Sequence, residues 1–118
     1  NNEILANICF DFKDKKVQLT NYSIKSHCSD KDFSHLRNWV IEVSKDKRVW
    51  VEIDKHVEDG TLNGKDIIKN FKVQKPKNDF YRYIRIRQIG CSWFSPPERY
   101  YFLCLSQIEF FGKLHFYK

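Results

Sequence analysis

Residues 90–101 hold the side chains with the clearest capacity to bind a ligand. Trp93 and Phe94 form an aromatic pair, and Pro96-Pro97 follows it closely. Because proline stiffens a loop, such a pair could stack on a sugar or fill a pocket in a protein partner. Nearby polar and charged side chains could add hydrogen bonds. The sequence therefore predicts a ligand-binding set made of Trp93, Phe94, Arg99, Tyr100, Lys55 and His56.

Each member of this set also has a structural interpretation. Tryptophan is usually largely buried, so either ring of the aromatic pair could instead fold back and cover the end of the core. The sequence gives the two interpretations of each ring equal weight. For the four polar members taken singly, an ordinary surface position is the stronger interpretation.

An arginine-rich segment is a second candidate for binding. Arg85 and Arg87 share one face of an expected strand and could bind phosphate or carboxylate. We prefer a solvated or ion-paired sheet face, with Arg82 beside it. Tyr81 and Tyr83 interleave with the arginines, as in a single-strand nucleic-acid platform. No nucleic-acid fold motif accompanies them, so a nucleic-acid partner is not expected.

Metal and catalytic sites find little support. One histidine and cysteine set has no standard zinc spacing, and hydrogen-bonded surface histidines explain it better: His27, Cys28, His35 and Cys91. One acidic set could bind calcium only with well-placed carbonyl groups: Asp30, Asp32, Glu58 and Asp59. The chain has no nucleophile elbow, phosphate loop or zincin helix. We therefore expect no metal, no cofactor and no catalysis.

Composition places the chain among small folded domains. It has 118 residues, of which 42% are hydrophobic and 16% aromatic, enough for the core of one domain. No apolar run approaches the length of a membrane span. The net charge of +6 favours an acidic partner. The lysines are spread along the chain, however, so an ordinary basic surface is the stronger interpretation.

The cysteines and the first residues bear on the setting of the domain. Cys9 and Cys104 stand among apolar residues and are expected to be buried on strands. This position favours free thiols and a reducing compartment. The chain has no Met and begins with Asn1, so we expect a fragment of a larger protein.

The elements that position these side chains are strands, because apolar residues recur mostly with a period of two. A one-residue slip in this period predicts a bulge near Thr20-Asn21. Gly112 is expected to close the last strand. The expected strands are residues 8–12, 17–24, 39–44, 50–53, the later part of 67–73, 80–89 and 102–111.

Antiparallel strands that each cross the domain would place successive connections at alternate ends. One end would hold residues 13–16, 45–48 and 75–79. The other would hold the longer loops, which are residues 27–35, 55–66 and 90–101. Long loops on a rigid β scaffold are the usual place for binding, so the second end is the expected site.

Four segments resemble the discoidin family, also called the coagulation factor 5/8 type C family. Residues 36–46 (LRNWVIEVSKD) followed by residues 50–54 (WVEID) resemble its central hairpin, and residues 80–88 (FYRYIRIRQ) resemble its arginine-rich late strand. Residues 105–112 (LSQIEFFG) resemble its closing strand. Residues 8–12 (ICFDF) and 22–26 (YSIKS) resemble the early strand pair of the family. The resemblance covers roughly nine tenths of the chain.

The resemblance implies an all-β, jelly-roll sandwich with a galactose-binding-like fold. Two departures stand out. The family usually has one or two further strands first, so the sandwich is expected to lack its first strand or strands. Extracellular members usually join the ends of the domain by a disulfide, but residues 105–118 contain no cysteine. The similarity is therefore greatest to intracellular versions, including those of protists.

The resemblance also implies a module that binds rather than catalyses, and the fold alone does not fix its ligand. We expect an intracellular, cytoplasmic protein-interaction domain within a larger protein or assembly, with an acidic partner such as a cytoskeletal or scaffold protein. The alternative is a secreted or cell-surface domain that binds carbohydrate or anionic lipid.

Overall fold

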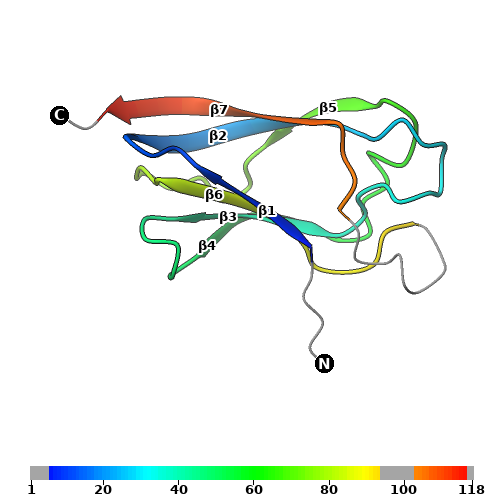
Figure 1. Ribbon diagram of the computed structural model, residues 1–118, viewed down its shortest axis with the longest axis horizontal. Helices are drawn as coiled ribbons and strands as arrows, with labels where there is room; N and C mark the ends of the chain where they lie inside the picture. Colours follow the sequence, from blue (N-terminus) through cyan, green and yellow to red (C-terminus); the bar gives the residue numbers. More distant parts are fainter. Residues whose placement is uncertain (1–5, 94–102, 117–118) are drawn as a thin grey trace.

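Among the described residues, seven strands form two antiparallel sheets that pack face to face (Figure 1). The computed structural model describes residues 6–93 and 103–116. One sheet has the order β1-β6-β3-β4 and the other β5-β2-β7. This arrangement confirms the predicted sandwich. The strands are β1 (Asn7–Asp11), β2 (Lys15–Lys25), β3 (Trp39–Ser44), β4 (Val51–His56), β5 (Ile68–Lys72), β6 (Tyr83–Gln88) and β7 (Gln107–Phe116).

The apolar alternation of the strands supplies the core between the sheets. In β2, Val17 and Leu19 are buried, and so are Tyr22 and Ile24 after a one-residue slip. The pairing of β2 with β7 shifts register between Leu19 and Asn21, which confirms the predicted bulge. The opposite sheet contributes buried residues from three strands, namely Trp39, Ile41, Val43, Ile53, Ile84 and Ile86.

The last strand differs from the prediction at both ends. It begins at Gln107, where its pairing partner in β2 is Lys25, the last residue of that strand. Cys104 therefore precedes the strand and is half-buried rather than fully buried. The strand also continues past Gly112 to Phe116. Residue 102 of the predicted strand lies outside the described residues.

Gly112 lies inside β7 because the bulge of β2 brings the two backbones close together. It pairs with Leu19, next to the register shift. A Cβ atom at position 112 would lie 2.0 Å from the carbonyl oxygen of Gln18. Only glycine fits such an approach, which is a common reason for glycine within a strand. The residue marks the bulge and not the strand end.

The connections alternate between the two ends of the sandwich, as predicted (Figure 1). At one end, Lys45 pairs with Asp79 at 2.7 Å. At the other end, the backbone amide of Asp32 donates to Asn63 at 2.8 Å, and Asp66 donates to the carbonyl of His27 at 3.2 Å. The described part of the chain contains no helix that is long and apolar enough to cross a membrane.

Candidate functional site

Three loops are tied together at the expected binding end, which we call the loop end (residues 27–35, 55–66 and, of the third loop, the described residues 90–93). Asn38, just before β3, is the residue that joins two of them. Its side-chain oxygen accepts from the backbone amide of Glu58 at 2.7 Å, and its amide nitrogen donates to the Cys91 carbonyl at 3.1 Å. Asn38 is buried, so these bonds are shielded from water. The loop end is therefore preorganised by the scaffold.

Trp93 is half-buried and already has protein groups close to it. The guanidinium of Arg37 lies over its ring, 4.4 Å from the centroid. Gly60 lies near the ring as well, because a Cβ atom there would be 3.6 Å from Cζ2. The Trp93 Nε1 atom is buried without a hydrogen-bond partner among the described residues. The Trp93 ring thus lies beside both Arg37 and Gly60.

Arg37 is held in place over Trp93 by the acidic loop beside it. Its guanidinium forms an ion pair with Glu58, with Nε 2.8 Å from Oε1, and donates to the Ser92 carbonyl at 3.4 Å. The hydrogen bond from Arg37 is the main reason why the pKa of Glu58 lies below its ordinary value. Cation–π stacking of this kind adds to the ion pair.

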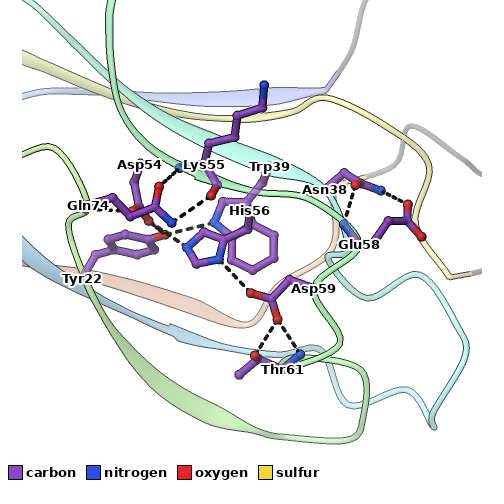
Figure 2. A network of polar contacts seen from close by, with 10 residues as sticks. All are labelled: Tyr22, Asn38, Trp39, Asp54, Lys55, His56, Glu58, Asp59, Thr61 and Gln74. Atoms are coloured by element: carbon purple, nitrogen blue, oxygen red, sulfur yellow. Dashed lines mark hydrogen bonds and ion pairs between the residues drawn. The ribbon is translucent and has the colours of Figure 1, made fainter.

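The other predicted site residues fall into three groups. Lys55 is exposed, and Figure 2 shows its side chain leading away from the polar network. Its backbone amide and carbonyl are bound by the side chain of Gln74 at 3.1 and 3.0 Å. His56 follows Lys55 on β4, and its side chain lies inside the polar network. Phe94, Arg99 and Tyr100 lie outside the described residues. Their part in binding stays a prediction, as does that of the other three.

His56 connects the core of the sandwich to the loop end (Figure 2). Its Nε2 atom is 2.9 Å from Asp54, and its Nδ1 atom is 2.7 Å from Asp59. The ring stacks on Trp39 with the centroids 4.4 Å apart. Asp59 in turn accepts from the backbone amide of Thr61 at 2.9 Å. The imidazole therefore binds two carboxylates and is not a free ligand-binding group in this conformation.

Asp54 is the buried centre of the network, on β4 (Figure 2). It accepts hydrogen bonds from the Tyr22 hydroxyl and, at 3.0 Å, from the backbone amide of Gln74. Trp39 Nε1 donates to the Tyr22 oxygen at 3.0 Å. A buried carboxylate needs several such donors to be tolerated in a core.

The electrostatics of the network follow from burial and these bonds. Burial, together with the bond to Asp54, raises the pKa of the Tyr22 hydroxyl far above its ordinary value. Burial alone would lower the pKa of His56, but the bonds to Asp54 and Asp59 outweigh it and raise the pKa. Burial would raise the pKa of Asp59, but its bonds to Thr61 and His56 lower it. Tyr22 is thus neutral, while His56 favours its charged form.

Sequence reasoning missed three residues of this end. His35 was expected at the surface but is fully buried, because Nε2 donates to the carbonyls of Ser29 and Asp30 at 2.8 and 2.9 Å. This bonding folds the 27–35 loop around the ring. Phe33 in the same loop is 44% exposed, and Val57 is 60% exposed. No periodic pattern in a loop could have separated these exposed apolar groups from the buried histidine.

Of the solvated and ion-paired sheet faces that the sequence favoured, the arginine-rich strand forms the ion-paired one. Arg85 and Arg87 both bind Glu42 of β3, at 2.8 and 3.0 Å. Arg85 also lies 3.9 Å from the centroid of the Trp50 ring. Burial would raise the pKa of Glu42, but the bonds from Arg87 and Arg85 lower it. The two arginines are therefore satisfied within the sheet.

The described residues offer two further observations on possible sites. They contain no group of three or more His, Cys, Asp or Glu side chains that could hold a metal ion. A shallow hollow of about 300 Å³ lies at the opposite end of the sandwich, at the turn between β3 and β4. Its lining is mainly apolar and consists of Lys45, Asp46, Val49, Val51 and Tyr81.

Comparison with known proteins shows the fold. No protein-family model matches the chain. A family 32 carbohydrate-binding module from Streptococcus pneumoniae EndoD matches with a TM-score of 0.62 and 5% identity, over 91% of this chain and 69% of that one. A putative chitobiase fragment from Bacteroides thetaiotaomicron matches with a TM-score of 0.63 and 15% identity, and the match covers 100% of this chain and 66% of that chain. The chain thus has the galactose-binding-like sandwich of such modules.

A sequence relative comes from a different kind of protein. The chain is 30% identical over 97 residues to the E3 ubiquitin-protein ligase Ufd4 of Drosophila melanogaster. The match covers 80% of this chain but 3% of that protein. The chain therefore spans one small part of this relative.

Proposed function

We propose that this chain is a non-catalytic binding module whose ligand binds at the loop end. The observation that carries the proposal is the sandwich fold shared over 91% of the chain with a carbohydrate-binding module. The bonds from Asn38 to Glu58 and Cys91 support it, because they hold separate loops in one arrangement before any ligand arrives. Preorganised loops lose less conformational entropy on binding.

A carbohydrate is the first candidate ligand. Both structural neighbours come from proteins with sugar-related names, a carbohydrate-binding module and a putative chitobiase. The loop end offers the exposed ring of Phe33, the half-buried ring of Trp93 and the ammonium group of Lys55. Aromatic rings with adjacent hydrogen-bond donors are what sugar recognition requires.

A glycan array probed with the 118-residue chain tests this proposal, followed by calorimetry with the strongest glycan. We expect Phe33→Ala and Trp93→Ala to weaken binding by roughly tenfold or more, the equivalent of about 1.4 kcal/mol. Phe111→Ala is the matched control, since this ring is also 44% exposed but lies on β7. Absence of any glycan signal, or unchanged affinity in both loop variants, would refute the carbohydrate proposal.

An acidic protein surface is the second candidate, within an intracellular assembly. The ligase relative and the net charge of +6 favour it. Binding to an acidic peptide such as oligoglutamate should then weaken with added salt and in Lys55→Glu. This candidate would be favoured if the glycan array gives no signal while the acidic peptide binds in a way that weakens with added salt and in Lys55→Glu.

The cellular setting has its own test. All four cysteines lie among the described residues and are free thiols there. We propose a cytoplasmic setting, with a secreted or surface setting as the alternative. Mass analysis of native protein under non-reducing conditions should find four free thiols. Paired cysteines would contradict the cytoplasmic setting.

A further inference from the structure

His56 forms hydrogen bonds that only its charged form can satisfy together. Its two ring nitrogens each face a carboxylate oxygen, from Asp54 at 2.9 Å and from Asp59 at 2.7 Å. A carboxylate only accepts, so each nitrogen must carry a proton. A neutral imidazole has one ring proton and would turn a lone pair toward one of the two carboxylates. One of the two bonds must then be lost.

The bond to Asp59 is the one that can be given up. The Asp54 side chain is fully buried and cannot exchange His56 for water, whereas the Asp59 side chain is 23% exposed. Leaving a buried charge without its donor costs more than exposing a partly solvated one. Neutral His56 should therefore keep its proton on Nε2, toward Asp54.

Asp59 in turn anchors the segment of residues 57–62. Its other carboxylate oxygen accepts from the amide and hydroxyl of Thr61. Its own backbone amide donates to the Arg37 carbonyl at 2.9 Å. Next along the chain, Gly60 lies near Trp93. Loss of the His56 bond would thus loosen a segment that contacts Arg37, just before β3, and Trp93 of the loop end.

Acidic and phenolic side chains lie around His56 in the described part of the chain. Asp54 faces it from its own strand, Asp59 from the following loop, and the Tyr22 hydroxyl of β2 reaches it through Asp54. The remaining ring contacts are Trp39 of β3 and Phe71 of β5, which do not titrate. With Tyr22 neutral, His56 is the group in this cluster whose charge can change by loss of a ring proton.

We propose that protonated His56 positions residues 57–62 at the loop end, and that loss of its Nδ1 proton releases this segment and weakens ligand binding there. The structural half of this proposal stands on the geometry alone. The binding half rests on the proposed function. His56 acts through Asp59 and is therefore a positioning residue.

Hydrogen exchange of the free protein tests the structural half without any ligand. The Thr61 and Asp59 amides should lose protection, relative to their intrinsic exchange rates, as pH rises through the titration of His56. The loss should approach tenfold per pH unit, the limit for release of one proton. The Ile41 amide in β3 is the internal reference, because global unfolding would lower its protection together with that of Thr61 and Asp59.

Two variants and one control complete the test. In His56→Gln, protection of Thr61 should be low at every pH, and Asp59→Asn gives the same result if the first variant does not fold. His115→Gln, an exposed histidine on β7, should behave like the wild type. A pH profile of Thr61 that is flat in the wild type, or unchanged in both variants, overturns the proposal.

The binding half is read separately, with the glycan or acidic peptide that binds at neutral pH. Its affinity should fall over the same pH range in the wild type and in His115→Gln. If no probe binds, the proposed function fails while the exchange data still decide the role of His56. If a probe binds and its affinity stays constant over the pH range in which the Thr61 amide loses protection, the binding half of the inference is wrong. The proposed function then survives.

Discussion

The Tyr22 hydroxyl joins the two sheets in the middle of the sandwich. It accepts from Trp39 Nε1 and donates to Asp54, so residues of β2, β3 and β4 meet at one oxygen atom. The ring stacks on Phe71 with the centroids 5.2 Å apart, and the residue is fully buried. An apolar ring would pack as well. The hydroxyl is what allows a carboxylate to lie in this core, since a buried acceptor needs donors.

Tyr22→Phe should therefore destabilise the fold although it removes one atom. The change leaves Trp39 Nε1 without an acceptor and Asp54 with one donor fewer, which costs about 1–3 kcal/mol. Urea unfolding followed by tryptophan fluorescence measures the difference. Tyr83→Phe is the matched control on β6, and there a change within about 0.5 kcal/mol is expected. Equal effects of the two substitutions would contradict this role of the Tyr22 hydroxyl.

His56 should also give the whole fold a dependence on pH. Its folded pKa is raised above the ordinary value of 6.5, so its contribution to stability is complete below that value and is lost as pH rises through the folded pKa. The unfolding free energy of the wild type should thus decrease over this range. In His56→Gln the decrease should disappear. A wild-type stability that stays constant from pH 6 through the titration of His56 would be inconsistent with the raised pKa.

At the scale of elements, the pairing of β2 with β7 depends on one glycine. The bulge at Leu19–Asn21 lets both strands keep their apolar side chains in the core on either side of the slip. The cost of the bulge is a close approach of the backbones at Gly112. Bulges also increase strand twist, which helps a long strand to follow a curved sheet.

Gly112→Ala should weaken this pairing. The added methyl group would meet the Gln18 carbonyl oxygen at 2.0 Å, so the strands must separate locally, at a cost of about 1–3 kcal/mol. Gly60→Ala is the control, because its Cβ atom would meet Trp93 at 3.6 Å, an ordinary contact. Thermal unfolding should show a lower Tm for Gly112→Ala and little change for Gly60→Ala. A Tm for Gly112→Ala equal to that of the wild type would contradict the close approach.

At the scale of the whole molecule, the sandwich has two different ends and one apolar edge. The strands run along its longest dimension of 48 Å, so the loop end is far from the opposite end, which holds the turn between β3 and β4 (Figure 1). Strand β7 is an edge among the described strands. It carries three exposed apolar side chains, Phe111, Leu114 and Phe116, at 44%, 55% and 56% exposure. A long apolar edge favours pairing with other strands.

The isolated 118-residue chain should accordingly associate as its concentration rises. Leu114→Lys should reduce the association, because it adds charge to the edge of β7. Val49→Lys is the control, since Val49 is 69% exposed but lies in the turn before β4. Sedimentation velocity over a range of concentrations measures the effect. If sedimentation does not depend on concentration, or if both variants change it equally, the edge is not the cause.

Much of the fold could be predicted because its signals are local. The period of two in residues 17–24 and 39–44 placed the strands, and the slip at Thr20-Asn21 placed the bulge. Alternate ends for the connections followed from antiparallel pairing alone. Gly112 was misread, since a glycine that ends a strand and one that faces a bulge look the same until the partner strand is known.

The sequence by itself determined the all-β sandwich and the end where the long loops lie. The reason is that apolar and polar residues alternate along each strand, so consecutive residues show which side chains are buried. Only the tertiary structure decided what those loops contain. It placed Arg37 over Trp93, buried His35 and joined Tyr22, Asp54, His56 and Asp59 into one network. Such contacts join residues up to 56 positions apart, as Trp93 and Arg37 are. They depend on which strands become neighbours, and no local period encodes that.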